Sequence, residues 1–321
     1  MAVTLRWGVI GTGRIAHTFA TDLRHVEECE IVAVGSRSME CADAFAIEYA
    51  VPHRYGTYEE LVADPDVDVV YVATPHPMHF ANATLALEHD KPVLVEKAFT
   101  MTADEARALV ALARERSLFM MEAMWSRFLP HTEAIRALLR EGALGDIVAV
   151  HADHGQWFER DPAFRLFAPE LGGGALLDLG IYPVSFASMI LGAPDRVTGM
   201  VDPTFTGVDG QSSMLFGYRG GAQAVLTCTS SARSATRASI VGTDARIEID
   251  SDFYAPTAFS LIPRNGDIRR FMFETVGRGL HYQAREVARC IAAGALESEI
   301  MPLDETVAIM ETMDAIRAFL K

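Results

Sequence analysis

The stretch LRWGVIGTGRIA, residues 5–16, decides the fold of this chain. A short apolar run passes into Gly11-Thr12-Gly13-Arg14-Ile15-Ala16, and an apolar helical pattern follows it. Gly11 allows a tight turn after a strand, Gly13 lets the backbone approach a pyrophosphate, and Ala16 lets the helix pack closely on its strand. The N-terminus of such a helix offers N–H groups and partial positive charge to phosphates. The stretch therefore predicts a dinucleotide-binding turn with residues 11–15 at the cofactor, and the alternative is a glycine turn of another α/β protein.

The end of the second apolar run, residues 30–35, bears on which dinucleotide is bound. It is followed by Ser36-Arg37-Ser38, where an NAD-specific site usually has a carboxylate on the ribose 2′-hydroxyl. A carboxylate would repel a 2′-phosphate, whereas a guanidinium pairs with it through a planar fork. We expect NADP(H), with Ser36 and Arg37 at its phosphate. The alternative is that Arg37 is a solvated loop arginine.

Strands and helices alternate through the first 120 residues. Strand-like runs lie at residues 5–10, 30–34, 67–73, 92–95 and 118–121, and helical patterns lie at 15–26, 39–49, 77–88 and 103–116. Apolar strands separated by helices indicate a parallel sheet with right-handed crossovers. Thr57, Pro77 and Thr102 stand where helices are expected to begin. The pattern predicts a Rossmann doubly wound parallel sheet, an NADP-binding domain over residues 1–122.

The pattern changes after about residue 123. A helix is expected at 131–141 and a strand at 147–154. Several strand-like runs lie between residues 197 and 261, including 211–218, 222–230, 238–241 and 245–249, and closing helices are expected at 282–293 and 304–320. Consecutive strands with turn residues between them indicate an open sheet. We expect residues 123–321 to form a C-terminal α/β domain with an open, mainly antiparallel sheet for substrate binding and dimerisation. Its closing helices could pack back on the first domain.

Composition excludes several classes of protein. A chain of 321 residues is too long to fold around one ordinary hydrophobic core, so we expect two domains. The formal charge of −15 argues against nucleic-acid binding, which needs a basic surface. Four cysteines without CxxC spacing indicate reduced thiols, and no signal peptide is visible, so we expect a soluble, cytoplasmic protein. The apolar segment 175–193 is expected to be a buried helix rather than a membrane span. The stretch 264–270 is expected to be a solvated loop.

Polar residues follow the third and fourth predicted strands, at Ala73-Thr74-Pro75-His76-Pro77-Met78-His79 and at Val95-Glu96-Lys97-Ala98. The carboxyl ends of parallel strands line the ligand crevice of a doubly wound sheet. Lys97 is poorly placed for full solvation, and burial lowers a lysine pKa from about 10.4. Such a lysine can hold a substrate oxygen and exchange a proton, although it could instead be a surface lysine paired with Glu96.

No metal site is expected. The pairs His76/His79 and His151/His154 are each spaced as HxxH, but no Cys or carboxylate completes either set. Residues three apart on a strand also point to opposite faces, which weakens the second pair.

The run Gly172-Gly173-Gly174-Ala175-Leu176-Leu177-Asp178-Leu179-Gly180-Ile181-Tyr182 marks the second domain. Asp178 and Tyr182 are four apart, so on a helix they share one face. A carboxylate and a phenol on an otherwise apolar helix are costly to bury without a purpose, although a core tyrosine bonded to Asp178 is also possible. Trp125 and Phe158 could line an apolar pocket for substrate, or belong to the core.

Together these residues resemble the glucose–fructose oxidoreductase/inositol dehydrogenase (Gfo/Idh/MocA) family over essentially the whole chain. The GxGxxA turn, the segment 74–79, Glu96-Lys97 and the triple glycine before Asp178 carry the resemblance. The segments EAMWSRF (122–128), LLDLGIYP (176–183) and METMDAIR (310–317) are most similar to the branch of dimeric dihydrodiol dehydrogenases and NADP-dependent D-xylose dehydrogenases. The family's usual EKP is EKA here.

The resemblance implies an NADP(H)-dependent oxidoreductase that transfers hydride between nicotinamide and a sugar, trans-diol or related carbonyl compound. It implies Lys97 and Tyr182 as the acid–base pair with Asp178 assisting, and His79 and Trp125 near the nicotinamide. Thr74, Pro75, His76 and Glu96 are placed at the cofactor. It also implies a homodimer or higher homo-oligomer through the open sheet, without nucleic-acid or membrane partners. The alternative is an NADP-sensing regulatory or binding protein without turnover.

Overall fold

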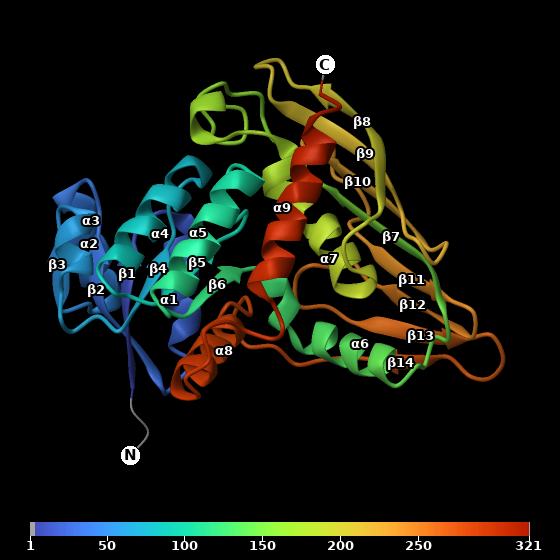
Figure 1. Ribbon diagram of the computed structural model, residues 1–321, viewed down its shortest axis with the longest axis horizontal. Coiled ribbons are helices and arrows are strands. Elements are labelled where there is room, and N and C mark those ends of the chain that lie inside the picture. The colour runs from blue at the N-terminus through green and yellow to red at the C-terminus, as the bar shows by residue number, and fades with distance from the viewer. Residues whose placement is uncertain (1–3, 321) are drawn as a thin grey trace. The chain divides into compact units, whose positions relative to one another are not determined.

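The computed structural model describes residues 4–320, which form two compact units. The first unit runs to Phe128 and includes Val276–Val307, and the second consists of Leu129–Thr275 and the residues from Ala308 onward. Figure 1 identifies the elements of each unit. The assignment of domain roles to residues 1–122 and 123–321 stays a prediction.

The first unit is built on a six-stranded parallel sheet, so the expected doubly wound fold is confirmed. The strands lie in the order β3-β2-β1-β4-β5-β6, and every neighbouring pair is parallel. They are β1 (Leu5–Ile10), β2 (Cys29–Gly35), β3 (His53–Tyr55), β4 (Val69–Val72), β5 (Val93–Glu96) and β6 (Met120–Ala123). Successive strands are added outward from β1 to β3 on one side and from β4 to β6 on the other, so the strand order reverses between β1 and β4. Doubly wound sheets bind ligands at this switch point. The sequence reading missed β3.

The helices that connect these strands are α1 (Arg14–Leu23), α2 (Met39–Tyr49), α3 (Tyr58–Val62), η1 (His76–Met78), α4 (His79–Glu88) and α5 (Ala103–Glu115). The unit also contains η2 (Trp125–Phe128), which follows β6, and α8 (His281–Ala292). The Thr57 hydroxyl accepts from the Glu60 N–H at 3.2 Å, and the Thr102 hydroxyl accepts from the Glu105 N–H at 3.3 Å. Both expected caps are confirmed. Each satisfies an N–H that the helix itself leaves without a partner.

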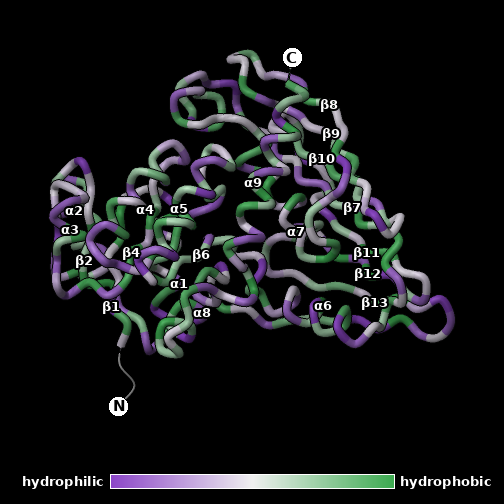
Figure 2. The backbone as a smooth tube through the Cα atoms, in the orientation of Figure 1, coloured by the Kyte–Doolittle hydropathy of each residue, from purple (hydrophilic) through white to green (hydrophobic). Residues whose placement is uncertain are grey.

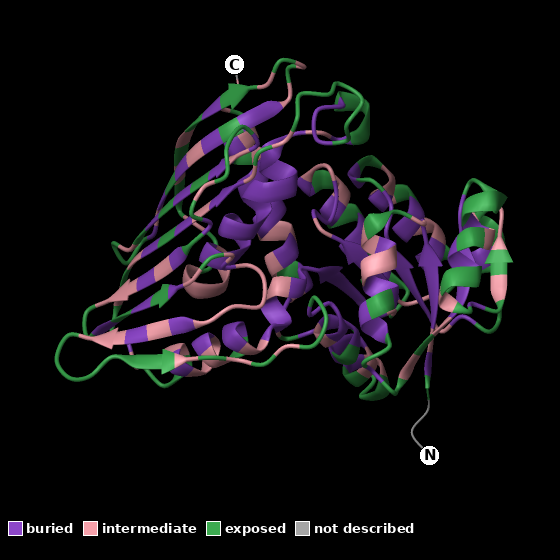
Figure 3. Cartoon of the chain, turned by 180° about the vertical axis from the view of Figure 1, so that it is seen from behind, coloured by how far each residue is buried: buried purple, intermediate pink, exposed green. Residues whose placement is uncertain are grey.

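The strands of the first unit carry its core. All residues of β4, β5 and β6 are buried, and Trp7 on β1 is 0% exposed. Figure 2 shows hydrophobic colouring along the central strands, and Figure 3 shows the same strands as buried. Strands covered on both faces require such unbroken apolar runs. Their polar neighbours therefore begin only where the strands end.

The second unit is built on an eight-stranded, mostly antiparallel sheet, which confirms the expected open sheet. Its strand order is β14-β13-β12-β11-β7-β10-β9-β8, and β7 with β10 is its parallel pair. The strands are β7 (Ile147–Gly155), β8 (Arg196–Pro203), β9 (Asp209–Gly217), β10 (Gln223–Thr229), β11 (Ala238–Gly242), β12 (Ala245–Ile249), β13 (Phe259–Pro263) and β14 (Arg269–Phe271). The reading of residues 264–270 as a loop was wrong at its end, because Arg269 and Arg270 belong to the edge strand β14.

Helices lie against this sheet on one face. They are α6 (Pro130–Arg140), η3 (Pro169–Leu171), η4 (Leu176–Gly180), α7 (Ile181–Leu191) and the part of α9 (Leu303–Arg317) from Ala308 onward. Of these, α7 and η4 contact β7 and β10. Burial alternates residue by residue along β10, as the striped strands of Figure 3 show. Met310, Met313 and Ile316 of α9 are 0% exposed, so these apolar residues at helical spacing on the helix belong to the core.

One helical segment, Pro169–Leu191, is long and apolar enough to cross a membrane by length and composition. Its most apolar window is 78% buried inside the protein, and a core helix passes the same test. The four cysteines are free thiols, with Cys228 and Cys290 buried and Cys41 exposed.

Candidate active site

The glycine turn joins β1 to α1 in the first unit. Gly11 has φ +100°, and a Cβ there would lie 2.9 Å from the Ala73 carbonyl oxygen, so both conformation and space require glycine. A Cβ on Gly13 would meet nothing within 4 Å. Gly13 is also the N-cap of α1, which has no side-chain cap. Packing therefore does not demand glycine at position 13, and the open N-terminus of α1 fits a phosphate group. Ala16 is 0% exposed, as its close packing requires.

The end of β2 lies beside this turn. The Thr12 hydroxyl donates to Ser36 Oγ at 3.4 Å, and the Ser36 hydroxyl oxygen accepts from the Ser38 N–H at 3.3 Å. Ser36 is 8% exposed, whereas Arg37 is exposed. Burial raises the pKa of the Tyr58 hydroxyl, and the adjacent Arg37 guanidinium opposes that rise. The segment thus presents a hydroxyl and a cation, with no carboxylate, where the 2′ position of an adenine ribose is expected.

His79 ties the ends of β4 and β5 together. Its Nε2 lies 2.8 Å from the Thr74 carbonyl oxygen and its Nδ1 lies 2.9 Å from the Ala98 carbonyl oxygen. The ring is 0% exposed, and burial lowers its pKa despite those two carbonyls. His79 therefore positions backbone, while its expected place near the nicotinamide stays a prediction. Asn82 Nδ2 donates to Thr74 Oγ1 at 3.1 Å and fixes the same segment.

Glu96 and Lys97 stand at the carboxyl end of β5. Glu96 is 4% exposed, and its Oε1 accepts from the Tyr71 hydroxyl at 2.6 Å. Its Oε2 accepts from the Lys97 N–H at 3.2 Å. Lys97 is half-buried, and the peptide bond that follows it is cis. The lysine is thus held at the strand end that lines a ligand crevice in this architecture.

Sequence reasoning missed a second buried acid beside this one. Glu122 is the penultimate residue of β6 and is 0% exposed, one register position from Glu96 on the neighbouring strand. Burial raises the pKa of Glu122 to about 7, while the Arg127 charge and the Thr306 hydroxyl oppose the rise. Arg127 is 3% exposed and pairs with Glu305 at 2.7 Å. Trp125 follows directly in η2, at 4% exposure.

The remaining residues expected at the cofactor lie around the same strand ends. His76 is buried in η1, with its ring centroid 5.6 Å from that of His79. Pro75 and Arg14 are exposed, and Ile15 is half-buried. The first unit therefore brings together the glycine turn and the ends of β2, β4 and β5, as the sequence predicts. Their contact with a cofactor stays a prediction.

In the second unit, the triple glycine positions the segment that carries Asp178. A Cβ on Gly174, which has φ +125°, would lie 2.2 Å from Asp209 Oδ1. Because Gly174 leaves this space free, Asp209 Oδ2 accepts a hydrogen bond from the Leu176 N–H at 2.5 Å, at the start of η4. Burial raises the pKa of Asp209, and the Leu176 N–H opposes the rise. A Cβ on Gly180 would lie 2.9 Å from Cys228 Sγ, so η4 packs tightly on β10.

Asp178 lies within η4, whose turn has π-helical spacing, and not in a regular α-helix. Such turns are common at functional sites. Asp178 is 7% exposed, and its Oδ2 accepts from Arg165 at 2.9 Å. Arg165 itself is half exposed, at 51% of its side chain. A nearly buried carboxylate is therefore paired with a cation that reaches it from the surface.

Tyr182 lies in the first turn of α7 among aromatic rings that sequence reasoning did not place. Its ring centroid lies 5.4 Å from that of His154 and 4.5 Å from that of Tyr254. The Gln156 side-chain amide donates to the Tyr254 hydroxyl at 3.2 Å, and its nitrogen lies 3.0 Å from His154 Nε2. His154 is buried while His151 is exposed, so the two point to opposite faces, as expected for that strand. These partners come from two separate segments, one with His154 and Gln156 and one with Tyr254, and no local motif marks them.

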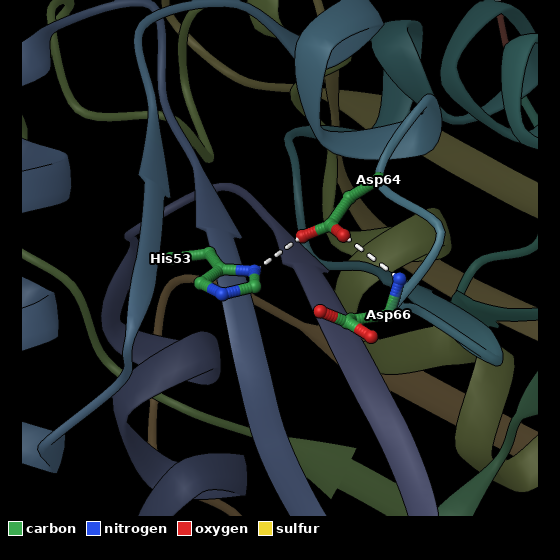
Figure 4. Close-up of side chains that lie close together, drawn as sticks. All are labelled: His53, Asp64 and Asp66. Atoms are coloured by element: carbon green, nitrogen blue, oxygen red, sulfur yellow. Dashed lines mark hydrogen bonds and ion pairs between the residues drawn. The ribbon is translucent and has the colours of Figure 1, made fainter.

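One group of side chains has the residue types of a metal site. A ligand atom from each of His53, Asp64 and Asp66 lies within 4.8 Å of the others, as Figure 4 shows. His53 Nδ1 lies 2.6 Å from Asp64 Oδ2, which also accepts from Tyr55, and Asp66 pairs with Arg6 at 2.7 Å. Protein groups thus already hydrogen-bond Asp64 and pair with Asp66, so we assign the cluster to the local structure around β3.

The fold and these strand ends define a class: a two-unit α/β protein with a dinucleotide turn. Family models agree with that class. The model described as oxidoreductase family, NAD-binding Rossmann fold, matches residues 5–124, and the GFO/IDH/MocA C-terminal domain matches residues 132–248. The chain belongs to the Gfo/Idh/MocA family of NAD(P)-binding oxidoreductases.

Relatives agree over nearly the full chain. A trans-1,2-dihydrobenzene-1,2-diol dehydrogenase of Xenopus tropicalis is 38% identical and covers 96% of each chain. The protein of that name from Homo sapiens is 35% identical and covers 98% of this chain and 96% of its own. These names support an enzyme acting on CH–OH groups of a small molecule.

Two solved structures share the fold. KijD10, a 3-ketoreductase from Actinomadura kijaniata in complex with NADP and TDP-benzene, has a TM-score of 0.88 at 25% identity, covering 98% of this chain and 97% of its own. An aldose-aldose oxidoreductase from Caulobacter crescentus, complexed with glycerol, has a TM-score of 0.90 at 25% identity, covering 99% and 97%. A diol dehydrogenase, a ketoreductase and an aldose oxidoreductase are thus among the proteins similar to this chain, and together they support sugar or diol oxidoreduction.

Proposed function

We propose that this protein is an NADP(H)-dependent oxidoreductase that interconverts a secondary alcohol or hemiacetal hydroxyl of a sugar or trans-diol with the matching carbonyl. The observation that carries the proposal is Lys97, half-buried at the carboxyl end of β5 in the unit that holds the glycine turn. Asp178 and Tyr182 supply the acid–base groups of the second unit.

The cofactor preference rests on the end of β2. Ser36 and Arg37 offer a hydroxyl and a guanidinium to a 2′-phosphate, and no carboxylate is present there to repel it. The N–H groups at the start of α1 would hold the pyrophosphate beside Gly13. Trp125 and the segment 74–79 would bound the nicotinamide end. When bound, the dinucleotide supplies or accepts the hydride.

The chain's own residues handle the proton. Lys97 Nζ holds the substrate oxygen, and either Lys97 or the Tyr182 hydroxyl exchanges its proton as the carbonyl forms or is reduced. Such proton transfer contributes roughly 10²–10⁴ in rate. Asp178, paired with Arg165, assists by orienting the groups beside Tyr182.

Mutants of a relative support this pair. Structures of the 3-ketoreductase include substitutions of one lysine and of one tyrosine, separated by almost the same number of positions as Lys97 and Tyr182. That protein covers 98% of this chain. We infer that its lysine and tyrosine match Lys97 and Tyr182.

The test is a panel of sugars, trans-diols and dicarbonyl compounds, followed at 340 nm with NADP+ or NADPH and repeated with NAD+ or NADH. We expect turnover of at least one sugar or diol with a preference for NADP(H). Tight NADPH binding with no turnover across the panel would instead favour a sensing protein.

We also infer a homodimer formed through the open sheet. Four apolar side chains on separate strands of that sheet are 42–69% exposed: Val148, Met200, Leu215 and Val225. An apolar sheet face of this kind needs a cover. Light scattering should give a mass near twice 35.1 kDa. Four free thiols fit the reducing conditions of the cytoplasm, the location that we propose.

A further inference from the structure

A cavity in the second unit has walls suited to a sugar ring. It measures about 430 Å³, within the range of small-molecule sites. Its walls come from three places: the segment after β7, the end of β8 with the turn that follows and the start of β9, and the segment after β10. We call it the Trp157 pocket and define it by Trp157, Arg160, Asp202, Phe205, Gln211 and Ser231.

One side of the Trp157 pocket is aromatic. Trp157 is 66% exposed and Phe205 is 42% exposed, although large aromatic side chains usually bury most of their surface. Phe205 also contacts protein groups, with the Phe167 ring centroid at 5.1 Å and the Arg160 guanidinium carbon at 4.6 Å from its own centroid. The exposed ring of Trp157 and the partly exposed ring of Phe205 thus line one cavity.

The other side of the pocket is polar. Its exposed side chains include Gln211, Ser231 and Asp202. Gln211 and Ser231 can both donate and accept hydrogen bonds, and Asp202 can accept them. Arg160 and Asp202 offset each other in charge, so the pocket selects no anion. A ring with C–H groups on its faces and hydroxyl groups on its rim matches both sides. That ligand is a neutral sugar.

The segment after β7 links this pocket to the groups proposed for catalysis. Gln156, the neighbour of Trp157, donates to Tyr254, whose ring packs on Tyr182. Further along the same segment, Arg165 pairs with Asp178 at 2.9 Å. The segment after β7 therefore has one side chain that contacts Tyr254, beside Tyr182, one that contacts Asp178, and others that line the Trp157 pocket.

We propose that the Trp157 pocket binds a second, non-reacting sugar ring of the substrate, so that the preferred substrates are disaccharides or glycosides. This inference rests on the proposed function and narrows its substrate class. Trp157 would stack on the distal ring, and Gln211 and Ser231 would hydrogen-bond its hydroxyl groups.

The test compares cellobiose, with two rings, and glucose, with one, by isothermal titration calorimetry on the full-length protein. We expect tighter binding of cellobiose in the wild type. Trp157→Ala should weaken cellobiose binding about tenfold, the loss expected when an aromatic anchor is removed, and leave glucose binding unchanged. Trp157→Phe should recover most of the affinity. Met272→Ala is the matched control, because it truncates an apolar side chain that is 79% exposed in the same unit outside the pocket.

Several results would overturn the proposal: no cellobiose binding, equal losses for both sugars, or a dimer that dissociates on Trp157→Ala, which would assign the pocket to a second copy of the chain. Turnover with NADP+ separates this inference from the proposed function. Sugar oxidation that is indifferent to Trp157→Ala refutes the pocket alone. Trp157-dependent cellobiose binding without oxidation of any sugar or diol refutes the function and leaves the pocket as a sugar site.

Discussion

Replacing Glu122 by glutamine should change how the stability of the protein depends on pH. Glu122 is fully buried at the end of β6, and burial raises its pKa to about 7 from the 4.5 of a solvated glutamate. Between these two values the carboxyl is neutral in the folded protein and ionised in the unfolded chain. The free energy of unfolding therefore falls as pH rises from 4.5 through 7.

The size of the effect follows from that difference in pKa. Each pKa unit corresponds to 1.36 kcal/mol, so the wild type should lose about 3 kcal/mol through this group between pH 4 and pH 8.5. Glutamine keeps the shape and stays neutral throughout, so the variant lacks this loss. Relative to the wild type, Glu122→Gln should gain about 3 kcal/mol over the same interval.

Urea unfolding at pH 4, 5.5, 7 and 8.5 measures this difference, and other titrating groups cancel between the two proteins. Glu115→Gln is the control, because it removes an exposed carboxylate from the same unit. Parallel pH curves for the wild type and Glu122→Gln would refute the reasoning, since they would show that Glu122 ionises normally in the fold.

Three further predictions concern the cofactor, the acid–base pair and the second unit. Arg37→Ala should lower NADP(H) affinity roughly tenfold to a hundredfold, because it removes a charge-assisted contact worth about 1.5–3 kcal/mol, while NAD(H) affinity stays constant. Ser36→Asp should invert the cofactor preference. If the ratio of kcat/KM for NADP(H) to kcat/KM for NAD(H) is the same in Arg37→Ala as in the wild type, Arg37 is only a solvated residue. Tyr182→Phe should lower kcat while the Kd for NADPH, measured by fluorescence, stays nearly constant, and unchanged turnover would exclude the hydroxyl from proton transfer. Burial lowers the pKa of His131 to about 4, so between pH 6.5 and pH 4 this side chain is neutral in the folded protein and charged in the unfolded chain. The free energy of unfolding of the wild type should therefore fall by about 3 kcal/mol through this group as pH falls from 6.5 to 4. Urea unfolding of His131→Asn should show a smaller fall over the same interval.

Local signals account for the parts of the fold that were predictable. The periodicity of residues 39–49 and the caps at Thr57 and Thr102 depend on neighbours a few positions away, and the structure has them where the sequence places them. The strands β3 and β14 were missed because they are three-residue edge strands with polar sequences, HRY and RRF. Edge strands of this kind gain their hydrogen bonds from a partner strand that local patterns do not reveal.

The candidate site divides in the same way. Ser36, Arg37 and Lys97 could be singled out because each directly follows an apolar strand. The partners of Tyr182 could not, since His154 and Tyr254 come from segments about 100 residues apart and meet only in the folded unit. Glu122 gave no signal either, because its burial beside Glu96 depends on the pairing of β5 with β6.

The most direct test of the central claim compares turnover by the wild type and by Lys97→Ala. The rate measured is NADPH formation from NADP+ and a sugar or diol of the panel, or NADPH consumption with the matching carbonyl compound, and the Kd for NADPH is measured on the same samples. The account predicts a fall in kcat of at least about a hundredfold, as loss of a proton-transfer group requires, with NADPH affinity nearly unchanged. Equal turnover in the two proteins would contradict it, because Lys97 would then take no part in the reaction.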